Sequence, residues 1–394
     1  MEVPPRLAFY VSWDASGTGG IKELILVYYA NDSTVELRNL QSNSGNLKRV
    51  AVPKHVAQSL YPGAQLVLFS RHLRIEDAAN EQTAAYLSRS MEPALCIWRV
   101  EDTHKYADTL QSLLNSGLIL TNCRLLALDE PLGEFLKAQT PEVVMQGDAS
   151  VSSSSTVAVF LLRGDNAAHK VRSLTAAGHE LLTTSADTPS AAVEELGMEL
   201  CEKAAPKPDA AAGVAATAVA ATTAAAATTP VAAAGEGAEL TCCVIKPHAL
   251  QQTGTVLREL SSSGLSIRNM QCFRLTSVAA REFLEIYDTV LKEFPKMVEE
   301  MTNGTVLAIQ LEGPDAVARL RRLAGPYDPE LCRYLYPSTL RAKLGNDVPR
   351  NALHCTDLAE DAALECSYFF QLMATHNRSA PHKAPFAPNN ATLV

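Results

Sequence analysis

The most informative segment of this 394-residue chain is Asn351-Ala352-Leu353-His354-Cys355-Thr356-Asp357. It follows Thr339-Leu340-Arg341, and a lysine stands far upstream in Val244-Ile245-Lys246-Pro247. Together these segments supply an imidazole nucleophile, two cations and amide donors. A phosphoryl group in transfer spreads negative charge over its oxygens, so a protein must mainly position it and offset that charge. Because histidine can carry such a group covalently, the pattern indicates phosphoryl transfer.

Composition excludes several classes of function. The length allows two or three domains, and 47% apolar with 20% charged residues is typical of soluble proteins. A net charge of -9, without any basic run, argues against a nucleic-acid partner. The nine scattered cysteines lack metal-ligand spacing, which predicts reduced thiols and no metal site in the chain. Because we find neither an apolar leader nor a run of about 20 apolar residues, we expect a cytoplasmic protein without membrane contact.

An alanine-rich segment divides the chain. Between Ala204 and Gly235, 17 of 32 residues are Ala, and no Leu, Ile or aromatic residue is present. Such a segment cannot bury a core, so residues 204–237 are predicted to be a linker. Residues 376–394 are rich in Pro and Asn and are predicted to be a tail.

An internal repeat flanks this linker. Ser116-Gly117-Leu118 recurs as Ser263-Gly264-Leu265, from residue 116 to residue 263, an offset of 147 positions. Thr156-Val157 recurs as Thr305-Val306 at an offset of 149, whereas Asp187 matches Asp357 only at an offset of 170. The chain therefore carries one unit twice. The first copy lacks about 21 residues where the second has Arg341 and Asn351.

Each unit is predicted to mix helices and strands. The second begins with an apolar run at residues 240–245, short enough for a buried strand. A helix over residues 254–263 follows and ends at Gly264. Further strands are expected at 266–275 and 305–311, and further helices at 279–291 and 295–301. This order predicts a sheet covered by helices.

A last helix is predicted to open with a capping box of Asp357 and Glu360 and to extend to about Met373. Residues on one face recur at three- and four-residue steps: Leu358, Ala362, Glu365, Phe369 and Leu372. Glu365 is thus a carboxylate on a stripe that faces the core, where a buried acid needs a partner. We expect it to orient His354. A rotated helix that leaves Glu365 on the surface is the alternative.

The second unit resembles a nucleoside diphosphate kinase. That family is marked by an Ile-Lys-Pro strand end and an Asn-x-x-His-x-Ser/Thr-Asp loop, which match Ile245-Lys246-Pro247 and the segment from Asn351 to Asp357. Gly325-Pro326-Tyr327-Asp328-Pro329-Glu330 and Pro337-Ser338-Thr339-Leu340-Arg341-Ala342 narrow the resemblance to a ciliary and flagellar branch of the family. Members of that branch have a DM-10 domain followed by two kinase-like units.

The first 90 residues fit that plan. Short strands separated by turns are expected at residues 9–13, 24–29, 34–37 and 66–69. Phe69-Ser70-Arg71, Ile75-Glu76-Asp77 and Gln82-Thr83-Ala84 are similar to the pattern of the DM-10 domain, which has a pleckstrin-homology-like shape and occurs in axonemal proteins.

The resemblance implies an α+β fold in three parts. Residues 1–90 would be the pleckstrin-homology-like β domain. Two ferredoxin-like α/β sandwich domains of the nucleoside diphosphate kinase type would follow, a degenerate one at residues 91–203 and one with the retained histidine at residues 238–375.

The resemblance also assigns roles to individual residues. His354 would be the phosphate-accepting nucleophile, and Glu365 the acid beside it. The nucleotide-binding residues would be Lys246, Arg321, Arg341 and Asn351. Arg321 also fits a solvated helix face, since it lies among other arginines. Mg²⁺ would accompany the nucleotide.

The last unit departs from the family pattern around the nucleotide. Tyr327 stands where a phosphate-contacting Thr is usual, and Cys355 replaces a glycine. An ungapped comparison places Glu285 and Glu293 where the family has a Tyr and a base-stacking Phe. These departures predict weak binding of the base.

The first unit departs further. Trp98 or Arg99 occupies the lysine position, and Thr184 the position of the nucleophile. We expect no phosphohistidine chemistry in this copy.

Two functions are compatible with these patterns. The one we favour is an axonemal structural protein, a microtubule inner protein of flagellar doublets with residual activity in the last unit. Its partners would be tubulin, other axonemal proteins and nucleoside di- and triphosphates, in the cytoplasm, cytoskeleton and axoneme. The alternative is an active nucleoside diphosphate kinase that passes the terminal phosphate between nucleotides through a phosphohistidine.

Overall fold

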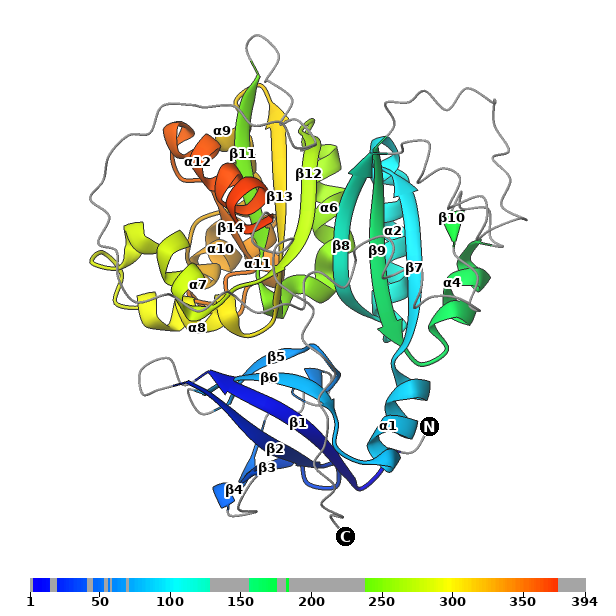
Figure 1. Cartoon of the computed structure of the whole chain (residues 1–394). Helices are drawn as coiled ribbons and strands as arrows, with labels where there is room; N and C mark the ends of the chain where they lie inside the picture. Colours follow the sequence, from blue (N-terminus) through cyan, green and yellow to red (C-terminus); the bar gives the residue numbers. More distant parts are fainter. Residues whose placement is uncertain are drawn as a thin grey trace, which may run out of the picture.

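The computed structural model describes residues 3–14, 20–40, 45–52, 56, 59–68, 71–127, 156–175, 182–183 and 238–374. These residues form two β-sheets with flanking helices (Figure 1). The predicted linker and tail lie outside the described residues. Within the ranges above, the helices are all too short or too polar to cross a bilayer.

The N-terminal part is a six-stranded antiparallel sheet with the order β4-β3-β2-β1-β6-β5. Its strands are β1 (Arg6–Asp14), β2 (Ile21–Tyr29), β3 (Thr34–Asn39), β4 (Gly45–Ala51), β5 (Gln65–Leu68) and β6 (Arg71–Ala78). Alternate apolar side chains such as Phe9, Leu26 and Ile75 are fully buried between the sheet and its cover. Helix α1 (Glu81–Ser90) follows, and the Asn80 side chain caps it by accepting a hydrogen bond from Thr83 N–H. The predicted strands are present, whereas β4 and β6 were not predicted.

The second sheet has eight strands in the order β10-β7-β9-β8-β12-β13-β11-β14. Their bounds are β7 Glu92–Arg99, β8 Ile119–Ala127, β9 Thr156–Gly164, β10 Leu182–Thr183, β11 Glu239–Ile245, β12 Ser266–Arg274, β13 Thr305–Gly313 and β14 Leu353–Cys355. The α-helices around it are α2 Thr103–Asn115, α4 Ala167–Thr175, α6 Thr253–Ser262, α7 Ser277–Phe283, α8 Phe294–Thr302, α9 Ala316–Ala324, α10 Pro329–Leu335, α11 Leu340–Leu344 and α12 Ala362–Ser367. Short 3₁₀ turns are η2 Val100–Asp102, η4 Pro247–Gln252, η5 Glu285–Tyr287 and η6 Ala359–Asp361, and Tyr368–Met373 forms a π-helical turn, η7.

The two halves of this sheet have the same strand order, counted from each edge toward the middle. Strands β10-β7-β9-β8 correspond to β14-β11-β13-β12, as the sequence repeat predicts. The halves meet where β8 pairs with β12, at Arg124 and Gln271, and helices α2 and α6 pack against each other on one face (Figure 1). Gly254 allows this packing, because a Cβ there would lie 2.4 Å from the Ala107 carbonyl oxygen.

The predicted last helix differs from the observed one. Asp357 forms no capping box, and helical structure starts at Ala359. Ala362 and Phe369 are buried, whereas Leu358, which precedes the helical segment, is 54% exposed, and Leu372, within the π-helical turn η7, is 52% exposed. The predicted stripe is therefore wrong at both ends.

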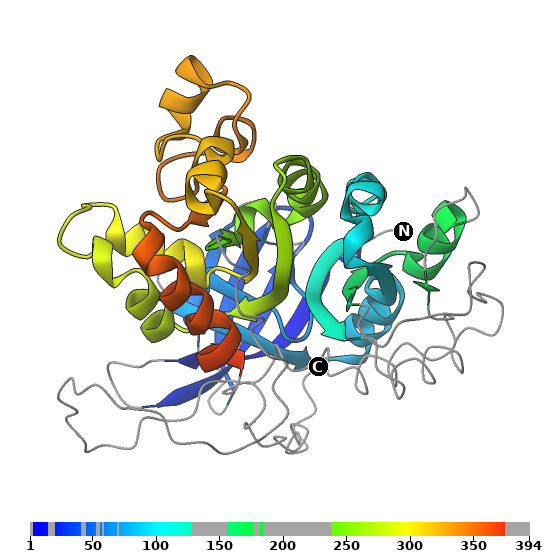
Figure 2. The same ribbon diagram turned by 90° about the horizontal axis from the view of Figure 1, so that it is seen from above.

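Strand β11 lies inside the sheet, whereas β14 forms its edge in the described part of the chain. Helices α10 and α11, coloured orange, stand away from the sheet (Figure 2). The site described below lies between these helices, the edge strand and the α7–α8 region.

Candidate active site

His354 lies on the edge strand β14, opposite Val244 of β11. Its side chain is 7% exposed, and the rings of Phe283 and Tyr287 approach it edge-on at centroid distances of 4.9 and 6.5 Å. The imidazole is thus confined on one side by aromatic rings and held by the sheet on the other.

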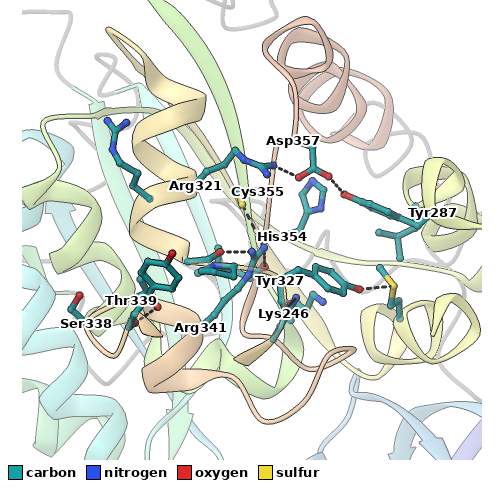
Figure 3. A pocket seen from close by; sticks show the side chains of 18 residues that line it. Lys246, Tyr287, Arg321, Tyr327, Ser338, Thr339, Arg341, His354, Cys355 and Asp357 are labelled. Atoms are coloured by element: carbon teal, nitrogen blue, oxygen red, sulfur yellow. Dashed lines mark hydrogen bonds and ion pairs between the residues drawn. The ribbon is translucent and has the colours of Figure 1, made fainter. Parts of the chain in front are cut away.

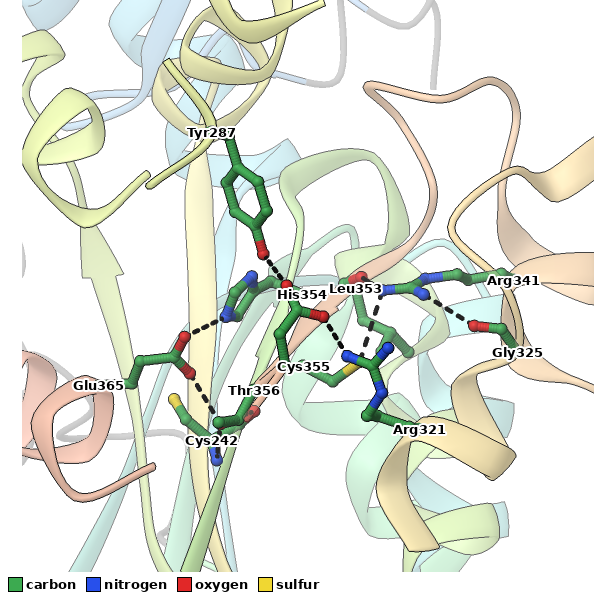
Figure 4. A network of polar contacts seen from close by, with 11 residues as sticks. Cys242, Tyr287, Arg321, Gly325, Arg341, Leu353, His354, Cys355, Thr356 and Glu365 are labelled. Carbon is green, nitrogen blue, oxygen red and sulfur yellow. Dashed lines mark hydrogen bonds and ion pairs between the residues drawn. The ribbon is translucent and has the colours of Figure 1, made fainter. Parts of the chain in front are cut away.

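Glu365 on α12 contacts His354, as predicted from the sequence. His354 Nε2 lies 3.0 Å from Glu365 Oε1, and Thr356 Oγ1 donates to Glu365 Oε2 at 2.7 Å (Figure 4). A carboxylate can only accept hydrogen bonds, so in the neutral imidazole the proton resides on Nε2. Nδ1 consequently keeps a lone pair for attack on an electrophile.

Lys246 follows β11 and lines the same cavity. Its side chain is 3% exposed, and its Nζ donates to the Pro349 carbonyl at 2.7 Å. Burial, reinforced by the positive charge of Arg341, lowers the pKa of Lys246 to about 7. The amine is therefore poised to gain a proton when an anion approaches.

Arg341 on α11 is held by backbone groups. Its Nη1 donates to Gly325 O at 2.8 Å and its Nη2 to Leu353 O at 3.1 Å, with Cys355 Sγ at 3.5 Å. Among the described residues, its buried Nε has no hydrogen-bond partner. The guanidinium is thus held by backbone groups while its Nε–H is left unused.

Asp357 links two walls of the cavity (Figure 3). It accepts hydrogen bonds from Arg321 on α9 and from the hydroxyl of Tyr287. Burial opposes ionisation, but these two donors and the charge of Arg321 together lower the pKa of Asp357. The pairing explains why Asp357 does not cap the last helix.

Asn351 and Tyr327 form the floor beside Lys246. Asn351 Nδ2 donates to the Tyr327 carbonyl at 3.0 Å, and its buried Oδ1 has no partner within the part of the chain that the structure describes. The Tyr327 hydroxyl donates to Met297 Sδ, and the Arg341 guanidinium lies 5.9 Å from the Tyr327 ring centre. Tyr327 therefore packs at the site instead of offering a hydroxyl like that of a threonine to a ligand.

These side chains line a cavity of about 590 Å³, a size typical of small-ligand sites (Figure 3). Of the predicted site residues, the cavity is lined by Lys246, Arg321, Arg341, Asn351 and His354, while Glu365 lies behind His354. The described part of the chain holds no group of three His, Cys, Asp or Glu side chains placed to bind a metal ion.

The ungapped comparison was wrong about the aromatic side of the cavity. Tyr287 lines it, whereas Glu285 and Glu293 do not. The helix predicted over residues 279–291 ends at Phe283 and is followed by the 3₁₀ turn η5, which carries Tyr287.

The middle unit offers a different environment at the equivalent strand end. Trp98 is buried and stacks on Tyr106 at 4.8 Å, and Arg99 is exposed. An indole in an aromatic cluster is a core residue and offers no charge to a phosphate. Thr184, predicted at the position of the nucleophile, lies outside the described residues.

Comparisons with known proteins relate this chain to nucleoside diphosphate kinases. A family model described as nucleoside diphosphate kinase matches residues 239–374. Nucleoside diphosphate kinase homolog 7 of Mus musculus is 28% identical over 372 residues, which cover 93% of this chain and 93% of that protein. The nucleoside diphosphate kinase of Aquifex aeolicus is 35% identical over 134 residues, which cover 34% of this chain and 94% of that protein. A crystal structure of an Aquifex aeolicus nucleoside diphosphate kinase aligns with 34% of this chain and 97% of that chain at 34% identity, with a TM-score of 0.33.

The resemblance predicted from the motifs is therefore confirmed. The C-terminal part has the ferredoxin-like fold of these kinases, joined to a β-rich N-terminal domain. This chain belongs to the nucleoside diphosphate kinase family.

Proposed function

We propose that the C-terminal unit transfers the terminal phosphoryl group between nucleoside tri- and diphosphates through a phosphohistidine on His354. The observation that carries this proposal is the arrangement of His354, whose Nε2 faces Glu365 while the ring lines a cavity together with four basic side chains. Those side chains belong to Lys246, Arg321, Arg322 and Arg341. A triphosphate in the cavity would meet both a nucleophile and the charges that stabilise its transition state.

The reaction follows from these positions. Nδ1 of His354 attacks the terminal phosphorus, and the bond from that phosphorus to the bridging oxygen breaks. The electron pair leaves with the diphosphate, and Glu365 stabilises the positive charge that develops on the ring. An oxygen of a second diphosphate then attacks the phosphohistidine, which restores the free imidazole. Mg²⁺ would arrive with the nucleotide as part of the substrate and neutralise phosphate charge.

The test is phosphoenzyme formation. The protein incubated with a nucleoside triphosphate labelled on its terminal phosphate, plus Mg²⁺, should become labelled in an acid-labile form. His354→Ala should abolish the label, whereas His104→Ala, at an exposed position on α2, should retain it. An unlabelled parent protein, or full labelling of His354→Ala, would refute phosphoryl transfer at this site.

We further propose a structural role in the axoneme as a microtubule inner protein, in which the phosphoryl-transfer site is one part of a larger assembly. The proposal treats residues 1–90 as a pleckstrin-homology-like DM-10 domain and residues 91–203 as a degenerate kinase-type unit. The buried Trp98 in place of a basic cradle supports the second assignment. Tubulin and other axonemal proteins would be the partners, in the cytoskeleton of the cilium or flagellum.

Fractionation tests the structural proposal. After detergent extraction of flagella, the tagged protein should remain with the axoneme and resist extraction together with doublet tubulin. Complete recovery in the soluble fraction would contradict the structural role and would leave the phosphoryl-transfer proposal unaffected.

A further inference from the structure

The backbone just before the nucleophile has an unusual conformation. Ala352 has φ +75°, a left-handed backbone conformation that residues other than glycine rarely adopt, and its side chain is fully buried. It lies between Asn351 and the strand that carries His354. Its carbonyl accepts a hydrogen bond from Lys246 N–H at 2.9 Å. Something else must hold the other side of this peptide, because such a conformation persists only where its surroundings determine it.

His248 supplies that second contact. The Ala352 N–H donates to His248 Nε2 at 3.2 Å, so this ring nitrogen acts as an acceptor. In the neutral ring the proton must then lie on Nδ1, which is 2.7 Å from Glu300 Oε1. The backbone N–H of His248 also donates to that oxygen, at 3.2 Å. Both nitrogens of the imidazole are thereby committed.

Glu300 fixes the orientation of the His248 ring. The carboxylate is 6% exposed and belongs to α8, the helix whose Met297 also receives the Tyr327 hydroxyl. No other hydrogen bond to the Glu300 carboxylate is present among the described residues, so His248 is its partner. A buried acid paired with one histidine orients that histidine strongly.

We propose that His248 and Glu300 are positioning residues, which hold Ala352 in its left-handed conformation and so set the place of Asn351 and His354 relative to Lys246. The chain of contacts runs from α8 through Glu300, His248 and Ala352 to the nucleophile strand. Neither side chain lines the cavity, so they act through the loop rather than on the nucleotide. The kinetic part of this inference rests on the proposed phosphoryl transfer, while its geometric part does not.

Two pairs of variants distinguish the effect of the hydrogen bonds from the effect of side-chain size. His248→Leu removes the acceptor for Ala352 N–H, whereas His248→Gln retains an amide oxygen with similar reach. Glu300→Leu removes the partner of Nδ1, whereas Glu300→Gln retains an oxygen that accepts both hydrogen bonds. The Gln variants should therefore behave like the parent, and the Leu variants should not.

The first readout is hydrogen exchange at the amide of Ala352. In the Leu variants it should speed up by roughly tenfold or more relative to the parent, with the central strands β11 and β13 unchanged. Unchanged exchange at Ala352 would overturn the proposal. A uniform rise across residues 238–374 would also overturn it, because it would mark a general loss of stability.

The second readout is phosphohistidine formation at saturating nucleotide. The Leu variants should slow it by roughly tenfold to a hundredfold, with a smaller effect on the nucleotide concentration at half-saturation, because the cations of the cavity remain. If the Leu variants are labelled at the normal rate although the amide of Ala352 exchanges faster, the positioning role is overturned. If the parent is never labelled, phosphoryl transfer fails, while the exchange experiment still decides whether His248 holds Ala352.

Discussion

Lys246 combines a buried position with a charge that depends on its surroundings. Its amine donates a hydrogen bond to the Pro349 carbonyl, and burial together with the nearby guanidinium of Arg341 opposes its protonation. A phosphate placed between these two side chains would offset that repulsion and raise the pKa of Lys246. Binding of nucleotide and uptake of a proton by Lys246 are therefore expected to be coupled.

The coupling predicts a pH dependence of nucleotide affinity. In the free protein Lys246 loses its proton as the pH rises through about 7, while the bound phosphates favour the charged amine. Above that value the protein must take up a proton to bind, so affinity should fall by up to about tenfold per pH unit. Titration calorimetry between pH 7.5 and 9 in two buffers would show this as proton uptake. Lys246→Gln should bind weakly with a flat profile; a flat profile in the parent would disprove the coupling.

Gly325 supports Arg341 through its backbone. It has φ +86°, and a Cβ there would lie 2.5 Å from Thr339 Oγ1, just before α11. Gly325→Ala should lower the free energy of unfolding by about 1–3 kcal/mol more than Gly264→Ala. Gly264 has φ +75° but faces only the tip of Arg319, so it serves as the control for strain without a clash. Chemical denaturation measures both, and equal losses would argue against the clash.

At the scale of elements, α2 and α6 form the joint between the two halves of the large sheet. Gln111 on α2 accepts from Thr255 N–H at 3.0 Å and donates to the Gln251 carbonyl at 3.1 Å. Ala107 and Gly254, which meet across the joint, are themselves separated by the repeat offset of 147 positions. Equivalent positions of the two units thus face each other, as across an approximate two-fold axis.

Substitution at this joint should be costly. Gly254→Ala would push a methyl group into the backbone of α2 at Ala107 and Gln111, and neither helix can shift without disturbing the shared core. We expect a loss of about 1–3 kcal/mol in the free energy of unfolding. Ser262→Ala, at an exposed position of the same helix, should change it by less than about 0.5 kcal/mol. A tolerated Gly254→Ala would mean that the helices are less closely packed than described.

Much of the architecture of elements followed from the sequence, and the exceptions have identifiable causes. Apolar runs and periodic apolar residues predicted β11, α6, β12 and β13, and the seven-residue signature identified His354. The place of Tyr287 in the site was missed because the predicted helix ends early, at Phe283, and Asp357 was expected to cap a helix instead of pairing across the cavity. Their mutual hydrogen bond joins residues 70 positions apart, and no local pattern reports such a pairing.

At the scale of the whole molecule, the three parts share contacts. The N-terminal sheet touches the C-terminal unit where Val67 N–H donates to Asn303 Oδ1 at 3.0 Å, directly after α8. The two sheet halves share one continuous core cluster. The repeat predicted two units, but it did not predict that their strands form a single sheet, because the spacing of a sequence repeat says nothing about how the two copies pack.

Truncation tests how far the C-terminal unit depends on its neighbour. Residues 238–374 alone would expose the packed face of α6 and the edge of β12, both covered in the whole chain. Exposed sheet edges and apolar helix faces favour self-association. Light scattering after gel filtration should show dimers or larger species. A stable monomer of this fragment would indicate that the joint contributes little.

The joint between α2 and α6 also has an evolutionary consequence. A unit that only supplies a docking face can accumulate changes wherever no neighbour touches it, so exchange of Arg99 should be neutral while exchange of Ala107 or Gln111 should not. Substitutions in the middle unit are therefore expected to reach the C-terminal unit mainly through the face of α2 that packs against α6.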